Sequence, residues 1–414
     1  MSNNLFLMNG NTPVLEVNPD TGLSEILNDR LPFSFVNALK PVKPYYEIHS
    51  EYDNTQNIIA IRNNGDIFLS WLANRMLLLS RKNAKKLYQA FRLEQREDKF
   101  SKAKLSLACR SLSILDNFWV KDINDDANWE DLNIRHRSLW EAVGQIALHG
   151  YSLSLQGSLD QTPEFTTNGA YAKAWRRYED GSLWLHKASE KNGEARIEAM
   201  VSDILDRCNV AHCHYEMTQD EGLDVCACPA MTKDNLSILD GALYCSYVTR
   251  QGLDPDKELQ KLDPDNYYKM MIVDYLIANP DRHSQNWGVY YDPDTMKIIS
   301  LHPLFDHNNA FDRMVMQDEN YQSHFLNHSL KENALWAMQK CDFHFNGDID
   351  RDLFITDRQY AAFMRHAEQL GITQKNDPDQ IHWCRQHSDA RLVTDEALME
   401  QMEEEWDKLN SIEI

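Results

Sequence analysis

The residues with the clearest chemical potential lie between Asp281 and Asp306. Asp281 and Asn286 have D-x-x-x-x-N spacing, and Asp306 follows a predicted hairpin. Carboxylate and amide oxygens are the ligands that Mg²⁺ prefers, and its remaining positions stay with water or phosphate. A further carboxylate can orient an attacking hydroxyl group and accept its proton. The three residue types therefore predict a site for phosphoryl transfer from a magnesium nucleotide.

The predicted hairpin explains why these side chains should meet. Residues 286–304 read as strand, Asp-Pro-Asp-Thr turn and strand. Because the two ends of a hairpin lie together, Asn286 and Asp306 are expected to be close, with Asp281 just upstream. The alternative is that Asp281, which follows Asn-Pro, is only a turn residue. That alternative does not explain the second aspartate at the end of the returning strand.

The segment from 279 to 286 carries a family resemblance. Its sequence, Asn-Pro-Asp-Arg-His-Ser-Gln-Asn, resembles the catalytic loop of the HipA-like serine/threonine kinases, and its Asp-Arg-His triplet is also similar to the loop of phosphoinositide kinases. The resemblance implies that Asp281 is the catalytic base and that Asn286 and Asp306 hold magnesium. Residues 307–311, His-Asn-Asn-Ala-Phe, replace the Phe-Gly of ordinary protein kinases, as expected in HipA-like chains.

A lysine within an apolar strand is the next candidate. Lys187 lies mid-strand, and a lysine in such a place usually needs an anionic partner. In a kinase the partners are ATP phosphate and a helix glutamate. Glu198, in a helix expected at 195–207, is favoured, and Glu194 one turn away is the second choice. The alternative for Lys187 is an edge-strand lysine that reaches solvent.

A candidate phosphate loop spans residues 166–173, Thr-Thr-Asn-Gly-Ala-Tyr-Ala-Lys. Gly169 would let backbone amides approach phosphate closely, although one glycine is a weaker signal than G-x-G-x-x-G. The segment is similar to the HipA-like loop, with Thr166 and Lys173 at the positions of its hydroxyl residue and its lysine. The resemblance implies autophosphorylation of Thr166, which would eject the loop and silence the enzyme. Thr stands here in place of the usual Ser.

Composition limits the classes of partner. The chain has 414 residues, 43% of them hydrophobic, and a net charge of −22. This charge argues against direct nucleic-acid binding and against anionic membranes. No apolar run approaches the roughly 18 residues of a membrane span. The N-terminus lacks the basic region of a secretory signal, so we expect a cytoplasmic protein without membrane contact.

A cluster of cysteine and histidine residues raises the question of zinc. The cluster contains no C-x-x-C pair, and part of it lies on a predicted strand. We therefore expect reduced thiols in a strand-rich core rather than a zinc site. The residues concerned are Cys208, His212, Cys213, His214, Cys226 and Cys228.

The fold class follows from the order of the patterns. Residues 1–150 read as a mixed α/β extension without a recognisable motif, either a structural buttress or a recognition module. Residues 151–235 read as strand, strand, helix, strand, strand, and residues 236–414 are mainly helical apart from the hairpin. These sections predict an α+β, two-lobed, protein-kinase-like fold with a small β-rich N-lobe and a mainly helical C-lobe.

Several helices can be placed more closely. Apolar residues near helical spacing predict helices at 101–116, 133–148 and 267–277, and the last of these leads into the catalytic loop. Thr356 and Thr394 are each followed by Asp and are expected to cap later helices.

The expected activity is that of an ATP- and Mg²⁺-dependent kinase acting on a Ser or Thr hydroxyl of a protein. The resemblance suggests a HipA-type toxin kinase with a small antitoxin-type partner, and any DNA contact would need a basic partner. One alternative is a lipid or small-molecule kinase, favoured by the triplet 281–283. Another is a nucleotide-binding pseudokinase that works as an interaction module. The presence of Lys187, Asp281, Asn286 and Asp306 argues against the pseudokinase.

Overall fold

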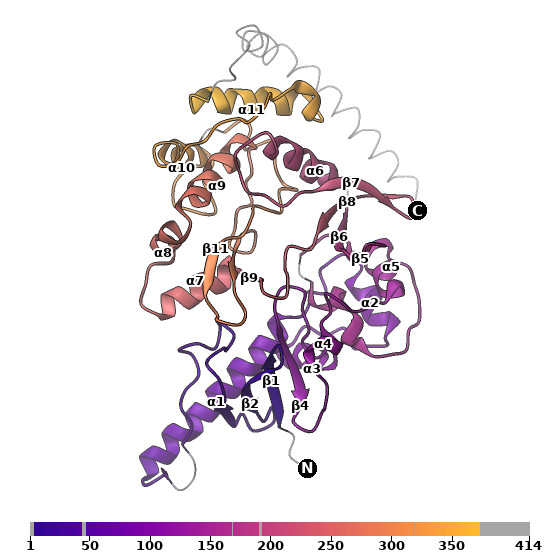
Figure 1. Ribbon diagram of the computed structural model, residues 1–414, viewed down its shortest axis with the longest axis vertical. Coiled ribbons are helices and arrows are strands. Elements are labelled where there is room, and N and C mark those ends of the chain that lie inside the picture. Colours follow the sequence, from indigo (N-terminus) through magenta and orange to yellow (C-terminus); the bar gives the residue numbers. More distant parts are fainter. Residues whose placement is uncertain (1–3, 44–46, 168, 190–192, 319, 373–414) are drawn as a thin grey trace, which may run out of the picture. The chain divides into compact units, whose positions relative to one another are not determined.

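The protein is a mixed α+β chain, as expected (Figure 1). The structure is a computed structural model that describes residues 4–43, 47–167, 169–189, 193–318 and 320–372. These residues form two compact units, and each unit is described by itself. The first unit contains the described residues up to Ala199, His212–Pro264 and His283–Asn308. The second contains Met200–Ala211, Asp265–Arg282 and the described residues from Asn309 onward.

The first unit begins with an antiparallel sheet in the order β3-β2-β1-β4. Its strands are β1 (Leu5–Asn9), β2 (Thr12–Val17), β3 (Ser24–Ile26) and β4 (Phe118–Asp122). Helix α1 (Glu51–Asn74) starts at Ser50, whose hydroxyl accepts a hydrogen bond from the backbone of Asp53, and it packs against α3 (Lys99–Ala108). The short helices in this region are α2 (Ala84–Ala90), α4 (Trp129–Leu132), α5 (Glu141–His149), η2 (Leu159–Gln161) and η3 (Pro163–Thr166).

Two helices are shorter than the sequence pattern suggested. The helix expected at 101–116 ends at Ala108, because Arg110 and Ser111 adopt left-handed backbone conformations with φ of 52° and 54°. The helix expected at 133–148 begins only at Glu141. Apolar residues before it, such as Ile134, are buried in a turn rather than in a helix. The apolar spacing therefore predicted buried residues correctly, but it predicted helices longer than those observed.

The second sheet of this unit carries the candidate site. Strands β5 (Lys173–Arg177), β6 (Leu183–Ala188), β7 (Glu216–Asp220) and β8 (Leu223–Pro229) pair antiparallel in the order β5-β6-β8-β7. Helix α6 (Glu194–Leu205) follows β6 in the chain. The expected order of strand, strand, helix, strand, strand is therefore observed.

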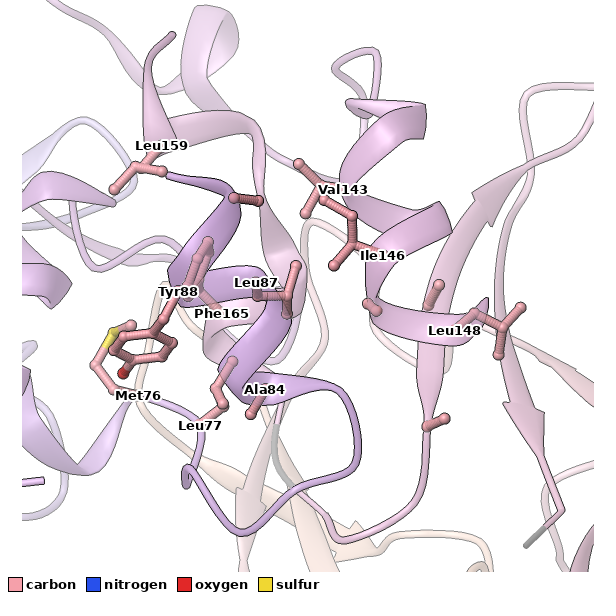
Figure 2. Close-up of a cluster of buried hydrophobic side chains, with 14 of the residues drawn as sticks. Met76, Leu77, Ala84, Leu87, Tyr88, Val143, Ile146, Leu148, Leu159 and Phe165 are labelled. Carbon is pink, nitrogen blue, oxygen red and sulfur yellow. The ribbon is translucent and has the colours of Figure 1, made fainter. Parts of the chain in front are cut away.

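One face of the β5-β6-β8-β7 sheet is buried against helices. Side chains alternate along β6, so Ala188 points to this face and Lys187 to the other. Figure 2 shows the hydrophobic cluster in which α2, α5 and η3 cover the sheet, with Leu87, Tyr88, Val143, Ile146 and Phe165 among its members. Full burial of such side chains contributes about 1.5–3 kcal/mol each. This packing fixes the strands that present Lys187.

A third sheet, in the order β11-β10-β9, contains the predicted hairpin. Its strands are β9 (Ser237–Asp240), β10 (Gly288–Tyr291) and β11 (Ile298–Leu301), and helices α7 (Gly241–Arg250) and α8 (Pro255–Leu262) lie between β9 and β10 in sequence. A residue of the N-terminal sheet and one of the segment after β3 contact the turn of the hairpin. The side-chain amide of Asn9 donates to the carbonyl of Pro293 at 2.8 Å, and Arg30 lies 3.5 Å from Asp294.

The second unit is helical in its described part. It contains the end of α6, nearly all of α9 (Pro264–Leu276), α10 (Leu330–Ala337), η4 (Arg351–Leu353) and α11 (Asp357–Gln369). Thr356 caps α11 in a reciprocal capping box with Gln359, as predicted. Thr394 lies outside the described residues. No helix in the described part of the chain is both long and apolar enough to cross a membrane.

Candidate active site

Lys187 is the centre of the site in the first unit. Its side chain is buried, and its ammonium group donates to Glu198 Oε2 at 3.0 Å, to the Tyr215 hydroxyl at 3.1 Å and to Asp306 Oδ1 at 3.2 Å. An ammonium group has three donors, and these three contacts match that number. The structure therefore pairs Lys187 with Glu198 rather than with Glu194.

Glu198 also fixes the segment that follows the hairpin. It is 1% exposed on α6, and its Oε1 accepts a hydrogen bond from the backbone N–H of His307 at 3.2 Å. One carboxylate thus connects strand β6, helix α6 and residues 306–307. This connection holds Asp306 within reach of Lys187.

The charges of this cluster are set by burial and by one another. Burial lowers the pKa of Lys187, but Asp306 and Glu198 outweigh it and hold the pKa well above its usual value. Burial raises the pKa of Asp306, but Lys187 and Lys173 together lower it to about 2. Burial raises the pKa of Glu198 against the opposing effect of Lys187. At neutral pH, Lys187 is therefore an ammonium ion and Asp306 a carboxylate.

Asp306 and Asn286 lie at the same end of the hairpin. Gly288 accepts a hydrogen bond from the backbone of His302 at 2.8 Å, so the chain leaves both strands together. Asp306 has a left-handed backbone with φ of 60°, a conformation in which Asp and Asn are enriched. Its side chain is 28% exposed and ionised, whereas Asn286 is buried. A carboxylate and an amide oxygen fit a Mg²⁺ ion that keeps other positions for phosphate or water.

The candidate phosphate loop has one strained glycine and a buried threonine. Gly169 has φ of +110°, and a Cβ there would collide with the ammonium group of Lys173. Thr166 lies in η3 and donates its hydroxyl hydrogen to the carbonyl of Pro163 at 3.2 Å. Modification of Thr166 would therefore require η3 to leave its place. Autophosphorylation stays a prediction of the resemblance.

Lys173 faces the same side of the sheet as Lys187. The two residues are direct partners in the β5–β6 register, and both side chains are buried. Burial and the neighbouring ammonium of Lys187 lower the pKa of Lys173 to about 7, with Asp306 opposing. The sequence placed Lys173 in the phosphate loop, and the structure makes it the first residue of β5.

The lowered pKa of Lys173 predicts how the free energy of unfolding depends on pH. Its pKa falls from the ordinary 10.5 to about 7 in the folded chain, so between these values the unfolded chain binds a proton that the folded chain lacks. The contribution of Lys173 to the free energy of unfolding therefore rises with pH across this window, by up to about 1.4 kcal/mol per unit. Lys173→Met should remove this slope in urea titrations at pH 7, 8 and 9. Equal slopes in both proteins would contradict the assignment.

The second unit contains Asp281 in a loop organised by α9. Ala278 adopts a left-handed conformation with φ of 46°, and the backbone N–H of Asn279 donates to the carbonyl of Asp274 at 2.8 Å. This is the hydrogen bond of a Schellman-type helix end. The Asn279 side chain donates to Asp274 Oδ1 at 2.9 Å and accepts from the backbone of Asp281 at 3.2 Å. The backbone is therefore fixed up to Asp281.

Arg282 supports the loop from inside. It is 1% exposed, and its guanidinium donates to both carboxylate oxygens of Asp274, at 3.1 Å through Nε and at 2.9 Å through Nη2. Asp274 is itself 2% exposed. Arg282 is thus used for structure and is not presented to a substrate head group, although its triplet resembles that of phosphoinositide kinases.

The cysteines near the site form part of its wall. Cys226 lies directly opposite Lys187 in the β6–β8 register. Cys213, Cys226 and Cys228 are buried around Tyr215, and each described cysteine is a free thiol. Burial raises the pKa of Cys226, so the thiol stays protonated at neutral pH. Reduced thiols in a strand-rich core are what the sequence predicted.

Sequence reasoning missed several residues around Lys187 in the first unit and around Asp281 in the second. Asp274 had a readable signal, because it is a carboxylate inside the apolar run Met270–Leu276. No sequence pattern pointed to Tyr215, which contacts Lys187. Asn309 was also missed, although its side-chain amide donates to Asp281 Oδ2 at 2.8 Å within the second unit. Contacts of this kind depend on the tertiary fold.

Comparisons with known proteins give structural similarity without sequence similarity. No family model matches the chain, and no curated protein matches it. A proinflammatory kinase of Helicobacter pylori, CtkA, is similar over 48% of this chain and 89% of its own, with 15% identity and a TM-score of 0.35. HipA of the Shewanella oneidensis MR-1 toxin–antitoxin system, solved with HipB and operator DNA, is similar over 78% of this chain and 83% of its own, with 11% identity and a TM-score of 0.41. Both similarities have TM-scores below 0.5 and identities of 15% or less, so they transfer no activity, substrate or partner to this chain.

Proposed function

We propose that this chain is an ATP- and Mg²⁺-dependent kinase of HipA-like type that transfers the γ-phosphoryl group to a Ser or Thr hydroxyl of a protein. The observation that carries the proposal is the buried cluster in which Lys187 contacts Glu198 and Asp306 at once. A strand lysine, a helix glutamate and an aspartate after a hairpin are the parts that position ATP in kinases. The contacts of Lys187 with Glu198 and Asp306 support this proposal.

Each residue of the first unit has a role in this proposal. Lys187 contacts the nucleotide phosphates, and Glu198 keeps its ammonium group oriented. Asn286 and Asp306 are the side chains that would hold Mg²⁺, which supplies charge neutralisation at the phosphates when bound. Gly169 allows the loop to approach phosphate closely, and Lys173, whose pKa of about 7 leaves it partly protonated at neutral pH, adds positive charge beside it.

Asp281 supplies the chemistry on the acceptor side. Its carboxylate orients the substrate hydroxyl and accepts its proton while the hydroxyl oxygen bonds to the γ-phosphorus. The bond from the γ-phosphorus to the bridging oxygen breaks, and ADP leaves. In this proposal residues 151–235 form the small lobe, residues 236–414 the helical lobe and residues 1–150 an N-terminal extension.

A protein acceptor is favoured over a lipid. The net charge of −22 opposes binding to an anionic membrane surface. The arginine that the chain shares with phosphoinositide kinases, Arg282, is paired with Asp274 inside the loop. A small antitoxin-type partner and a cytoplasmic location remain expectations of the resemblance and of the composition.

The proposal predicts radiolabel transfer from γ-labelled ATP to proteins of a bacterial lysate when Mg²⁺ is present, with label on serine or threonine after acid hydrolysis. Asp306→Ala is the control and should give none, because a metal ligand is lost. A parallel reaction contains phosphatidylinositol vesicles. Label in lipid alone would replace the protein kinase by a lipid kinase. No transfer despite ATP binding would favour a pseudokinase.

A further inference from the structure

Asn309 contacts the proposed catalytic base directly. Its side-chain Nδ2 donates to Asp281 Oδ2 at 2.8 Å, and both residues belong to the second unit. Asn309 lies three residues after Asp306, in the segment where ordinary protein kinases continue with Phe-Gly. Neither the D-x-x-x-x-N spacing nor the hairpin predicts a role for it.

The segment that carries Asn309 is anchored to the end of α9. The backbone N–H of Phe311 donates to the carbonyl of Ile277 at 2.7 Å. Phe311 is 6% exposed, and its ring lies edge-on to that of Phe354 with centroids 5.8 Å apart. Ala310, between Asn309 and Phe311, is 3% exposed. The position of the Asn309 amide is therefore set by packed neighbours.

Asp281, the proposed catalytic base, is also anchored to α9, through the residues Asn279 and Arg282 on either side of it. The backbone N–H of Asp281 donates to the Asn279 side chain, and Asn279 and Arg282 both bond to Asp274 on α9. The backbone of Asp281 and the amide that touches its carboxylate thus share one support. A carboxylate with a fixed backbone can still rotate about its last side-chain bond, and a donor on one oxygen restricts that rotation.

We infer that Asn309 is a positioning residue that orients the Asp281 carboxylate for proton transfer. The inference rests on the proposed function, because it takes Asp281 as the catalytic base. It assigns to Asn309 no contact with the nucleotide or the acceptor. Its effect is on the rate of the chemical step. Misplacement of a reacting group by about 1 Å can lower the rate about 10²-fold.

The first test compares Asn309→Ala with the wild-type chain in ADP production and phosphoryl transfer. We expect kcat to fall about 10²-fold while KM for ATP stays within about twofold, because the nucleotide-holding residues are untouched. Asn309→Asp, which keeps the shape and removes the donor, should lose at least as much. Asn320→Ala, an exposed asparagine of the following segment, is the matched control and should turn over normally.

A double variant shows whether Asn309 acts through Asp281. If it does, Asn309→Ala should lower the residual rate of an Asp281→Ala chain by less than about twofold, because the group that it orients is gone. A further loss of about 10²-fold would overturn the inference and indicate a general structural role. Wild-type turnover in both Asn309 variants, with Asp281→Ala inactive, would also overturn it. An Asp281→Ala chain with wild-type turnover would instead refute the proposed function itself.

Discussion

Replacing Asp281 by alanine is expected to lower kcat for phosphoryl transfer by about 10²–10⁴-fold, the usual contribution of a general base. The affinity for ATP with Mg²⁺ should stay unchanged. Lys187 and Asp306, which would hold the nucleotide and the ion, are joined by their own ion pair and do not depend on the Asp281 side chain. The loop should keep its conformation, because Asn279 and Arg282 fix it through Asp274.

The measurement separates binding from chemistry. Calorimetric titration gives the dissociation constant of ATP with Mg²⁺, and initial rates give kcat for both chains. Ser284→Ala changes an exposed residue of the same loop and serves as the control with wild-type turnover. Turnover at the wild-type rate in Asp281→Ala would mean that Asp281 is a turn residue, which is the alternative that the sequence left open.

Replacing Lys187 by methionine is expected to give the largest loss of stability. The change leaves Glu198 and Asp306 in the same buried cluster without their shared cation. Removal of one partner of a buried ion pair costs about 3–5 kcal/mol, because the remaining charge is uncompensated. The loss should shrink as the pH falls, since protonation of the carboxylates removes the uncompensated charge. Urea titrations of both proteins at pH 7 and pH 5 measure it.

A second substitution identifies the cause of that loss. In a chain with both Lys187→Met and Glu198→Gln, a neutral amide replaces the deeper carboxylate, so part of the lost stability should return. The melting shift produced by ATP with Mg²⁺ should stay small in both variants, because the phosphate contact is missing. A Lys187→Met chain as stable as the wild type would show that the cluster carries little energy.

The sequence was informative where a pattern is local. The hairpin of β10 and β11 follows from its turn residues, and a lysine between apolar neighbours predicted the buried Lys187. Such features depend on neighbouring residues, whose spacing the backbone geometry fixes. The pairing of Lys173 with Lys187 was not predicted, because the sequence analysis assigned Lys173 to the phosphate loop.

Features that depend on distant contacts were not readable. Glu198 could be separated from Glu194 only by the tertiary position of α6, since both lie on one helix turn. Asn309 reaches Asp281 through a segment that is held by Phe311 and Ile277. The burial of Thr166 in η3 depends on the packing of η3 against α5 and β5, which no pattern around residue 166 encodes.

The two buried lysines on β5 and β6 also determine how an anion reaches the site. ATP approaches a chain with a net charge of −22, so repulsion acts at long range, and the contacts of its phosphates with Lys173 and Lys187 act only at short range, beside Asp306 and Glu198. Added salt screens the long-range repulsion over about 10 Å at 0.1 M, whereas buried charges in contact are screened much less. Salt should therefore speed the encounter and alter the lifetime of the complex far less, the reverse of a kinase whose basic surface draws its nucleotide in.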